Sequence, residues 1–303
     1  MTAPQRPRVP RRALDGVLLL DKPIGLSSND ALIRAKRLYL AKKAGHTGTL
    51  DPLATGLLPL CFGEATKFSQ DLLEADKTYE ATMRLGVRTT TGDAEGEPID
   101  TRDVTCDPAA VQAAMQKFLG AIVQVPPMYS ALKRAGQPLY KLARAGVEVE
   151  REARQIELFA LRLLAFSAAA VELQAVCSKG MYVRTLAQDI AKALGTCGHV
   201  TALRRLYVEP FEGESMETLD SVADARQAGR WPRILPPDQP LGHLSALSLR
   251  LTDAARLLRG QAVTAPATGL PCRVRLYDEA GRFLGLGESD GLGNVQPRRL
   301  FVL

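Results

Sequence analysis

The apolar residues of this chain fall into short runs and into stretches with helical spacing. The run at residues 16–20 predicts a buried strand, and Ser27 or Ser28 begins a predicted helix that continues to about residue 43. The same criteria predict strands at 57–62, 78–85, 121–125, 158–166, 171–177 and 200–208, and helices at 64–73, 108–119 and 182–194. The chain thus mixes strands and helices, and it contains no internal repeat.

Residues 125–154 depart from this pattern because they are poor in apolar side chains and rich in basic ones. The basic residues surround Tyr129 and Tyr140, and they are Lys133, Arg134, Lys141, Arg144 and Arg151. The segment is interpreted as an excursion from the main sheet. Charge runs often only face water, so an ordinary solvated surface is the alternative.

The end of the chain forms a separate unit in the pattern. A proline-rich linker at 234–240 precedes a last segment, 247–303, in which short predicted strands are separated by glycines. This spacing predicts a small β-rich domain.

Composition narrows the class of protein. The chain has 303 residues, of which 46% are hydrophobic and 24% charged, so it can bury a large core and has room for two domains. It has no run of 18 apolar residues, and residues 1–12 are rich in arginine and proline, so a cytoplasmic protein with a mobile basic arm is expected. Five widely spaced cysteines without a C-x-x-C pair suggest neither disulfides nor zinc. A net charge of +6 favours a polyanionic partner.

The segment 45–59 places one carboxylate, Asp51, in a loop rich in glycine and proline. Gly48 and its neighbouring glycines permit backbone conformations closed to other residues, and Pro52 disfavours a helical Asp51. An aspartate before a proline is most often a turn residue, so the pattern alone leaves a structural role open. The sequence has no metal motif, no phosphate-binding loop of the Walker type and no Ser-His-Asp order.

Five segments of the chain resemble the successive motifs of the bacterial tRNA pseudouridine synthase B family (TruB). In chain order they are Leu20-Asp21-Lys22-Pro23, Gly45-His46-Thr47-Gly48-Thr49-Leu50-Asp51-Pro52, Lys77-Thr78-Tyr79, Cys177-Ser178-Lys179-Gly180-Met181-Tyr182-Val183-Arg184-Thr185 and Leu203-Arg204-Arg205. The resemblance runs from about residue 15 to the C-terminus.

The resemblance implies an α+β fold. A pseudouridine synthase catalytic domain with a central mixed or antiparallel sheet flanked by helices would span 14–240, after a disordered basic arm at 1–13. The basic stretch 125–154 would be a thumb-like insertion that closes over the T arm. Residues 247–303 would form a small, β-barrel-like PUA domain that holds RNA.

The implied activity is the isomerisation of the T-loop uridine at tRNA position 55 to pseudouridine. The enzyme would flip the base out, cleave its N1 glycosidic bond, rotate it and reattach it through C5, with no cofactor and no metal. Asp51 would be the catalytic carboxylate, either as nucleophile on sugar or base or as a base that removes a ribose proton. Arg184 would pair with Asp51 and keep its pKa low, and Tyr79 would stack on the uracil.

The resemblance also implies the residues that bind substrate. His46 would fill the space that the flipped base leaves, and Leu203 would form an apolar wall of the uracil pocket. Tyr182 and, in the insertion, Lys133 and Arg144 are further candidates. Lys22 is either structural or a phosphate contact. The partner would be the T arm and T loop of tRNA, without guide RNA, and the protein is expected to be a monomer.

Two other functions remain open at this stage. One is a protein whose main task is to bind and refold tRNA. The other is a glycosidase-like hydrolase, which needs a second carboxylate at roughly 5 to 10 Å from Asp51, and for which Asp21 and Asp189 are the candidates.

Overall fold

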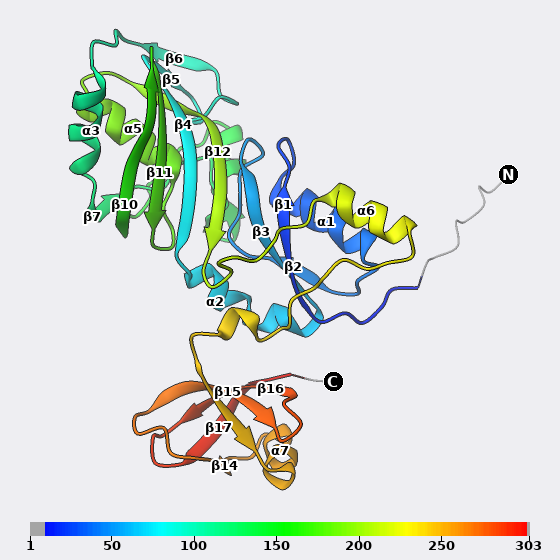
Figure 1. Cartoon of the computed structure of the whole chain (residues 1–303). Coiled ribbons are helices and arrows are strands. Elements are labelled where there is room, and N and C mark those ends of the chain that lie inside the picture. The colour runs from blue at the N-terminus through cyan, green and yellow to red at the C-terminus, as the bar shows by residue number, and fades with distance from the viewer. Residues whose placement is uncertain (1–9, 302–303) are drawn as a thin grey trace, which may run out of the picture.

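The computed structural model of the chain describes residues 10–301 and contains two main sheets (Figure 1). The large sheet has eight strands in the order β1-β3-β12-β4-β11-β10-β7, with β2 beside β3. The pairing of β12 with β3 is parallel and the other pairings are antiparallel, which confirms the mixed sheet. Its strands are β1 (Gly16–Lys22), β2 (Ala44–His46), β3 (Thr55–Phe62), β4 (Lys77–Leu85), β7 (Gly120–Gln124), β10 (Arg154–Ser167), β11 (Ala170–Cys177) and β12 (Gly198–Val208).

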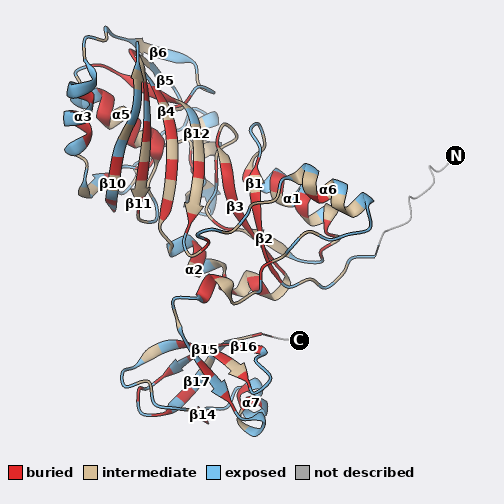
Figure 2. Ribbon diagram, viewed as in Figure 1, coloured by how far each residue is buried: buried red, intermediate tan, exposed pale blue. Residues whose placement is uncertain are grey.

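Helices α3 and α5 cover one face of this sheet (Figure 1), and the residues between the helices and the strands are buried (Figure 2) in one apolar cluster. Along β4, residues alternate strictly, so that Tyr79 and Met83 are buried while Glu80 and Thr82 lie on the other, more exposed face. Helix α5 (Val183–Ala193) buries Leu186 and the other apolar residues of one stripe in the same core cluster. Tyr79 therefore lies on the face that α5 covers.

The remaining helices of this part are α1 (Ser28–Leu38), the 3₁₀ helix η1 (Gly63–Phe68), α2 (Ser69–Glu74), α3 (Pro108–Gln116) and α6 (Leu219–Gln227). The helix expected to reach residue 43 ends at Leu38, since Leu40 is left-handed, with φ 53°, and the chain then enters β2. The helix expected at 64–73 divides into η1 and α2. Helix α6 and the hairpin of β5 (Val87–Thr89) and β6 (Pro98–Thr101) were not predicted.

The basic excursion at 125–154 forms a small hairpin and a short helix. They are β8 (Lys133–Arg134), β9 (Gln137–Pro138) and α4 (Leu139–Arg144). Leu139 is buried, whereas Lys133 and Arg144 are exposed. The segment leaves the large sheet after β7 and rejoins it at β10.

The second sheet has five strands in the order β13-β15-β16-β17-β14. Its elements are β13 (Ser245–Leu249), α7 (Leu251–Leu258), β14 (Val263–Thr264), β15 (Cys272–Asp278), β16 (Phe283–Ser289) and β17 (Asn294–Leu300), after a single 3₁₀ turn η2 (Gln239–Leu241). The short helix α7 was not predicted.

The small sheet packs against η1 and α2 of the first part. The rings of Phe68 and Phe283 lie 5.4 Å apart, and the guanidinium of Arg273 is 2.8 Å from the carboxylate of Asp71. Helix α2 thus lies between the two sheets (Figure 1).

The predicted N-terminal arm lies for residues 1–9 outside the described residues. Further along, Arg12 pairs with Ala41, and its guanidinium lies 4.4 Å from the ring of Trp231. Over residues 10–301, no helix is long and apolar enough to cross a membrane.

Candidate active site

Asp51 lies in the loop between β2 and β3, and buried polar groups hold this loop from several sides. The Ser28 hydroxyl, at the start of α1, donates to the carbonyl of Leu50 (3.0 Å) and accepts from its N–H (2.8 Å). Arg205 of β12 is almost fully buried and donates to the carbonyls of Gly48 (2.8 Å) and Leu57 (2.7 Å). These bonds fix the backbone on both sides of Asp51.

At position 48 the structure explains why the loop contains a glycine. Its φ is +67°, and a Cβ atom there would lie 3.0 Å from the Arg205 guanidinium. Only glycine combines this backbone conformation with so close an approach of the arginine.

Lys22, at the end of β1, is fully buried beside the same loop. Its ammonium group donates to the carbonyls of Pro23 (2.9 Å), Leu26 (2.6 Å) and Pro52 (3.4 Å). Burial lowers the pKa of Lys22 to about 8, while the charge of Asp51 opposes this shift. Of the two roles left open for Lys22, this geometry favours the structural one.

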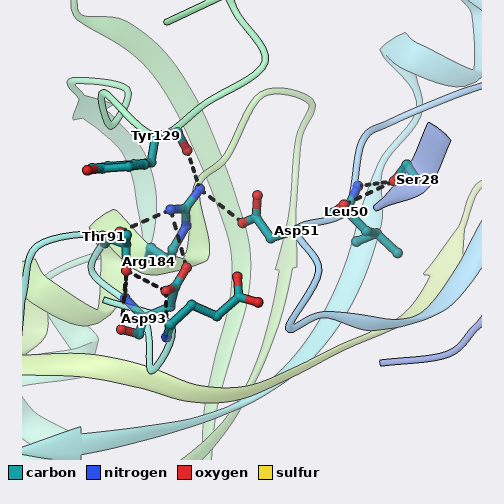
Figure 3. A network of polar contacts seen from close by, with 8 residues as sticks. Ser28, Leu50, Asp51, Thr91, Asp93, Tyr129 and Arg184 are labelled. Atoms are coloured by element: carbon teal, nitrogen blue, oxygen red, sulfur yellow. Dashed lines mark hydrogen bonds and ion pairs between the residues drawn. The ribbon is translucent and has the colours of Figure 1, made fainter. Parts of the chain in front are cut away.

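Arg184, in the first turn of α5, joins the loop to two other segments (Figure 3). Its Nη2 is 2.9 Å from Oδ2 of Asp51 and also donates to the carbonyl of Tyr129 in the insertion (2.7 Å). Its Nη1 donates to the carbonyl of Thr91 (3.0 Å) and lies 3.4 Å from Oδ2 of Asp93. Arg184, a residue only 5% exposed, thus shares its guanidinium between two carboxylates and two carbonyls.

Of the two carboxylates that contact Arg184, Asp93 is the one that sequence reasoning missed. It lies in the turn between β5 and β6, is 2% exposed, and accepts from the N–H of Glu95 (3.1 Å). In the sequence it appears only as an acid in a predicted turn, and aspartate is common in ordinary turns that belong to no functional site.

The pKa of Asp51 is raised above its ordinary value. Burial is the main cause, the neighbouring Arg184 is the largest opposing influence, and the charge of Asp93 raises the pKa further. The expected pairing with Arg184 is present, but the expectation of a low pKa is wrong. Desolvation outweighs the ion pair here.

Asp51 and Arg184 open into a cavity of about 740 Å³. Three other candidate residues line it, namely Tyr79, Tyr182 and Leu203. Burial raises the pKa of Tyr79, so its phenol keeps its proton at neutral pH. The cavity thus combines the Asp51 carboxylate with aromatic and aliphatic walls, as an unstacked base would need.

The other candidates do not line this cavity. His46 ends β2, where burial lowers its pKa and its Nδ1 has no hydrogen-bond partner among the described residues. Lys133 lines a separate cavity of about 440 Å³ within the insertion, and the Arg144 guanidinium lies 5.7 Å from the ring of Tyr140.

A glycosidase would need a second free carboxylate beside Asp51. Among the described residues that line the cavity, the other carboxylate is Glu74, which lies at the rim. Asp21 makes two bonds to Arg204 (2.9 and 2.8 Å), and Asp189 lies further along α5. Neither lines the cavity. In residues 10–301, no group of three metal-ligating side chains stands together.

Three family models match the chain. The TruB family pseudouridylate synthase N-terminal domain covers residues 36–183, the tRNA pseudouridylate synthase B C-terminal domain covers 184–236, and the pseudouridine synthase II TruB C-terminal region covers 245–301.

Individual proteins are similar over almost the whole chain. Those named tRNA pseudouridine synthase B from Burkholderia lata and Burkholderia mallei (strain ATCC 23344) are 62% and 60% identical over 99% of this chain and 94% and 98% of their own. Among solved structures, the archaeal box H/ACA sRNP Nop10–Cbf5 complex has a similar chain with a TM-score of 0.71 and 25% identity, covering 96% of this chain and 87% of that one. The same score and 26% identity are found for a Cbf5–Nop10–Gar1 complex, over 95% and 85% of the two chains.

Proposed function

This chain belongs to the TruB family of pseudouridylate synthases, and from this membership we propose that Asp51 is the residue by which it converts uridine to pseudouridine. The enzyme is a tRNA pseudouridine(55) synthase. The observation that carries the role of Asp51 is its position: it is the carboxylate lining the cavity that the Arg184 guanidinium contacts.

The reaction is an isomerisation, so its atoms balance within the substrate. The bond from C1′ to N1 breaks, a bond from C1′ to C5 forms, C5 loses its proton and N1 gains one. Ionised Asp51 serves either as the nucleophile or as the base that removes a ribose proton. Both roles need the carboxylate form. Because the pKa of Asp51 is raised, this form is reached only at a higher pH than for an ordinary aspartate.

Arg184 orients Asp51 and favours its ionised form against the effect of burial. Tyr79 acts as a stacking surface for the uracil, because a phenol with a raised pKa is a poor proton acceptor. Leu203 and Tyr182 complete the walls of the cavity. A T-loop uridine reaches this cavity only after it leaves its stack, and contacts in the cavity repay that cost.

The remaining proposals concern RNA and organisation. Residues 14–240 form the catalytic domain, residues 125–154 close over the T arm with Lys133 and Arg144, and residues 247–303 form an RNA-binding PUA-like domain. His46 occupies the space left by the flipped base. We place the protein in the cytoplasm as a monomer that acts without guide RNA; the exposed basic side chains of the insertion support direct contact with tRNA phosphates.

The test uses an unmodified tRNA transcript with tritium at C5 of its T-loop uridine. Incubation with the protein, without added metal or nucleotide, is expected to release tritium from that position. Asp51→Asn should release none while its tRNA affinity stays within a few-fold of wild type, because the amide keeps the shape but is neither nucleophile nor base. A rate retained by Asp51→Asn would refute the role of Asp51, and tight binding without release by the wild type would favour the tRNA-binding protein.

A further inference from the structure

Five cationic side chains line the Asp51 cavity, and three of them donate hydrogen bonds to backbone carbonyls of the protein. Arg184 and Arg205 are bonded as described above, and the buried ammonium of Lys77 donates to the carbonyl of Leu73 (3.0 Å), at the end of α2. The two that remain, Lys179 and Arg154, are exposed at the rim.

Lys179 differs from Arg154 because it is held by an acid across the opening of the cavity. Its ammonium forms an ion pair with Oε2 of Glu74, the last residue of α2. The side chains of Lys179 and Glu74 are 58% and 47% exposed, and both line the cavity. An ion pair this exposed to solvent is weak, so a competing anion can replace the carboxylate.

The backbone around Lys179 is fixed, which confines any rearrangement to its side chain. The neighbouring Ser178 accepts at its hydroxyl from the N–H of Glu157 (2.9 Å), and its own N–H donates to the Glu157 carbonyl (2.9 Å). Glu74 has a second partner, because Gln70 donates to its Oε1 (2.9 Å). Both residues can therefore exchange partners without disturbing the fold.

We propose that Lys179 is a phosphate-binding residue for the RNA substrate and that Glu74 occupies its ammonium group until an RNA phosphate replaces the carboxylate. The inference rests on the proposed function, since it names a contact of the same substrate at the rim of the same cavity. Helix α2 also contacts the small sheet through the ion pair of Asp71 with Arg273, so Glu74 lies on the helix that touches both the small sheet and the cavity.

The test is a double-mutant cycle on tRNA binding, measured in the Asp51→Asn background to prevent turnover. Lys179→Gln is expected to weaken binding about three- to tenfold and to lower the slope of log affinity against log salt by about 0.7–0.9, the value for one phosphate contact. Glu74→Gln is expected to tighten binding up to about fivefold at low salt, because it frees the lysine.

The decisive variant combines the two changes. If Glu74 acts by occupying Lys179, Glu74→Gln has no further effect once Lys179 is glutamine. If the carboxylate only repels RNA, Glu74→Gln tightens binding equally in both backgrounds, and the inference is refuted. The control is Arg233→Gln, which removes the cation of another exposed ion pair, 3.0 Å from Glu214 and outside the cavity. It should leave the slope unchanged.

Turnover separates this contact from a structural role. In the otherwise wild-type enzyme, Lys179→Gln should raise KM and leave kcat within about twofold, as expected for binding lost equally in ground and transition state. A lower kcat with unchanged affinity would overturn the inference. Tritium release by the wild type tests the proposed function separately: release combined with an unchanged salt slope would refute only the role of Lys179.

Discussion

The Asp51 loop and the insertion at 125–154 are both surrounded by cationic side chains, which serve different purposes in the two regions. Around the loop, Lys22, Arg184 and Arg205 are buried, and each is bonded to backbone carbonyls. In the insertion, Lys133 and Arg144 are exposed. Burial thus sorts cations of equal charge into those that fix the backbone and those that can exchange water and counterions for phosphate.

The two regions nevertheless meet at one side chain. The same Nη2 of Arg184 that contacts Asp51 also donates to the carbonyl of Tyr129, within the insertion. A movement of the insertion at Tyr129 therefore bears directly on the guanidinium that orients the carboxylate. The comparison predicts that variants of the buried cations change chemistry or stability, and variants of the exposed ones change salt-dependent binding.

The largest effect is expected for Arg184→Met. This change leaves Asp51 and the buried Asp93 without their shared cation, so Asp51 is both misplaced and harder to ionise. We expect kcat to fall at least about 10²-fold, the usual cost of a misplaced reacting group. Single-turnover tritium release at saturating tRNA measures it. Arg144→Met, which removes an exposed arginine, is the matched control and should retain kcat; a comparable loss there would remove the distinction between the two regions.

The next effect is on stability. Arg205→Met removes the charge-assisted bonds to the carbonyls of Gly48 and Leu57. The free energy of unfolding is expected to fall by about 3 kcal/mol, at one and a half or more for each bond to a charged group. Urea denaturation measures this loss. The salt slope of tRNA binding should not change, since a buried guanidinium has no access to phosphate; a lower slope would contradict the assignment.

These differences show what the sequence can and cannot predict. The glycines and Pro52 indicated an irregular loop around Asp51, and the ordered motifs indicated its pairing with Arg184, although 133 positions separate them. Asp93 was missed because nothing local distinguishes it from an ordinary turn acid. The pKa of Asp51 was wrong in direction, and Lys22 was left open, because both depend on burial, which arises only when distant segments pack together.

The prediction of secondary structure failed for a similar reason, at positions where tertiary contacts decide the backbone conformation. Residues 39–43 continue the helical pattern, yet Leu40 is left-handed and Ala44–His46 pairs with β3 instead. Helix α6 buries only Val222, so its apolar periodicity is weak, and α7 spans only 8 residues, which is shorter than the length of about 10–12 residues by which a helix is told from a strand in a sequence.

The pH dependence follows from the raised pKa of Asp51. Because the reaction needs the carboxylate, kcat/KM should fall with decreasing pH through a pKa above the ordinary aspartate value near 4. A carboxyl group whose pKa is higher in the folded than in the unfolded state stabilises the fold at low pH. This stabilisation is lost as the pH rises through the folded pKa. Asp51→Asn should therefore unfold at a higher temperature than wild type at pH 7, and the difference should shrink on acidification. An acid limb at or below pH 4 would contradict the dominance of burial.

The smallest effect is expected in the insertion. Lys133→Gln and Arg144→Gln, combined, remove two exposed cations, so KM should rise about threefold to tenfold and the salt slope of tRNA binding should fall by about 1.5. The free energy of unfolding should stay within about 0.5 kcal/mol, as for other surface changes.

Arg84→Gln with Arg162→Gln is the matched control, because it removes the same charge from exposed positions of β4 and β10 outside the cavity. Equal slopes for the two double variants would mean that overall charge, not the insertion, attracts the RNA. A reduced slope for the insertion variant alone, with kcat unchanged, would place its cations on the phosphates and leave the chemistry to the buried ones.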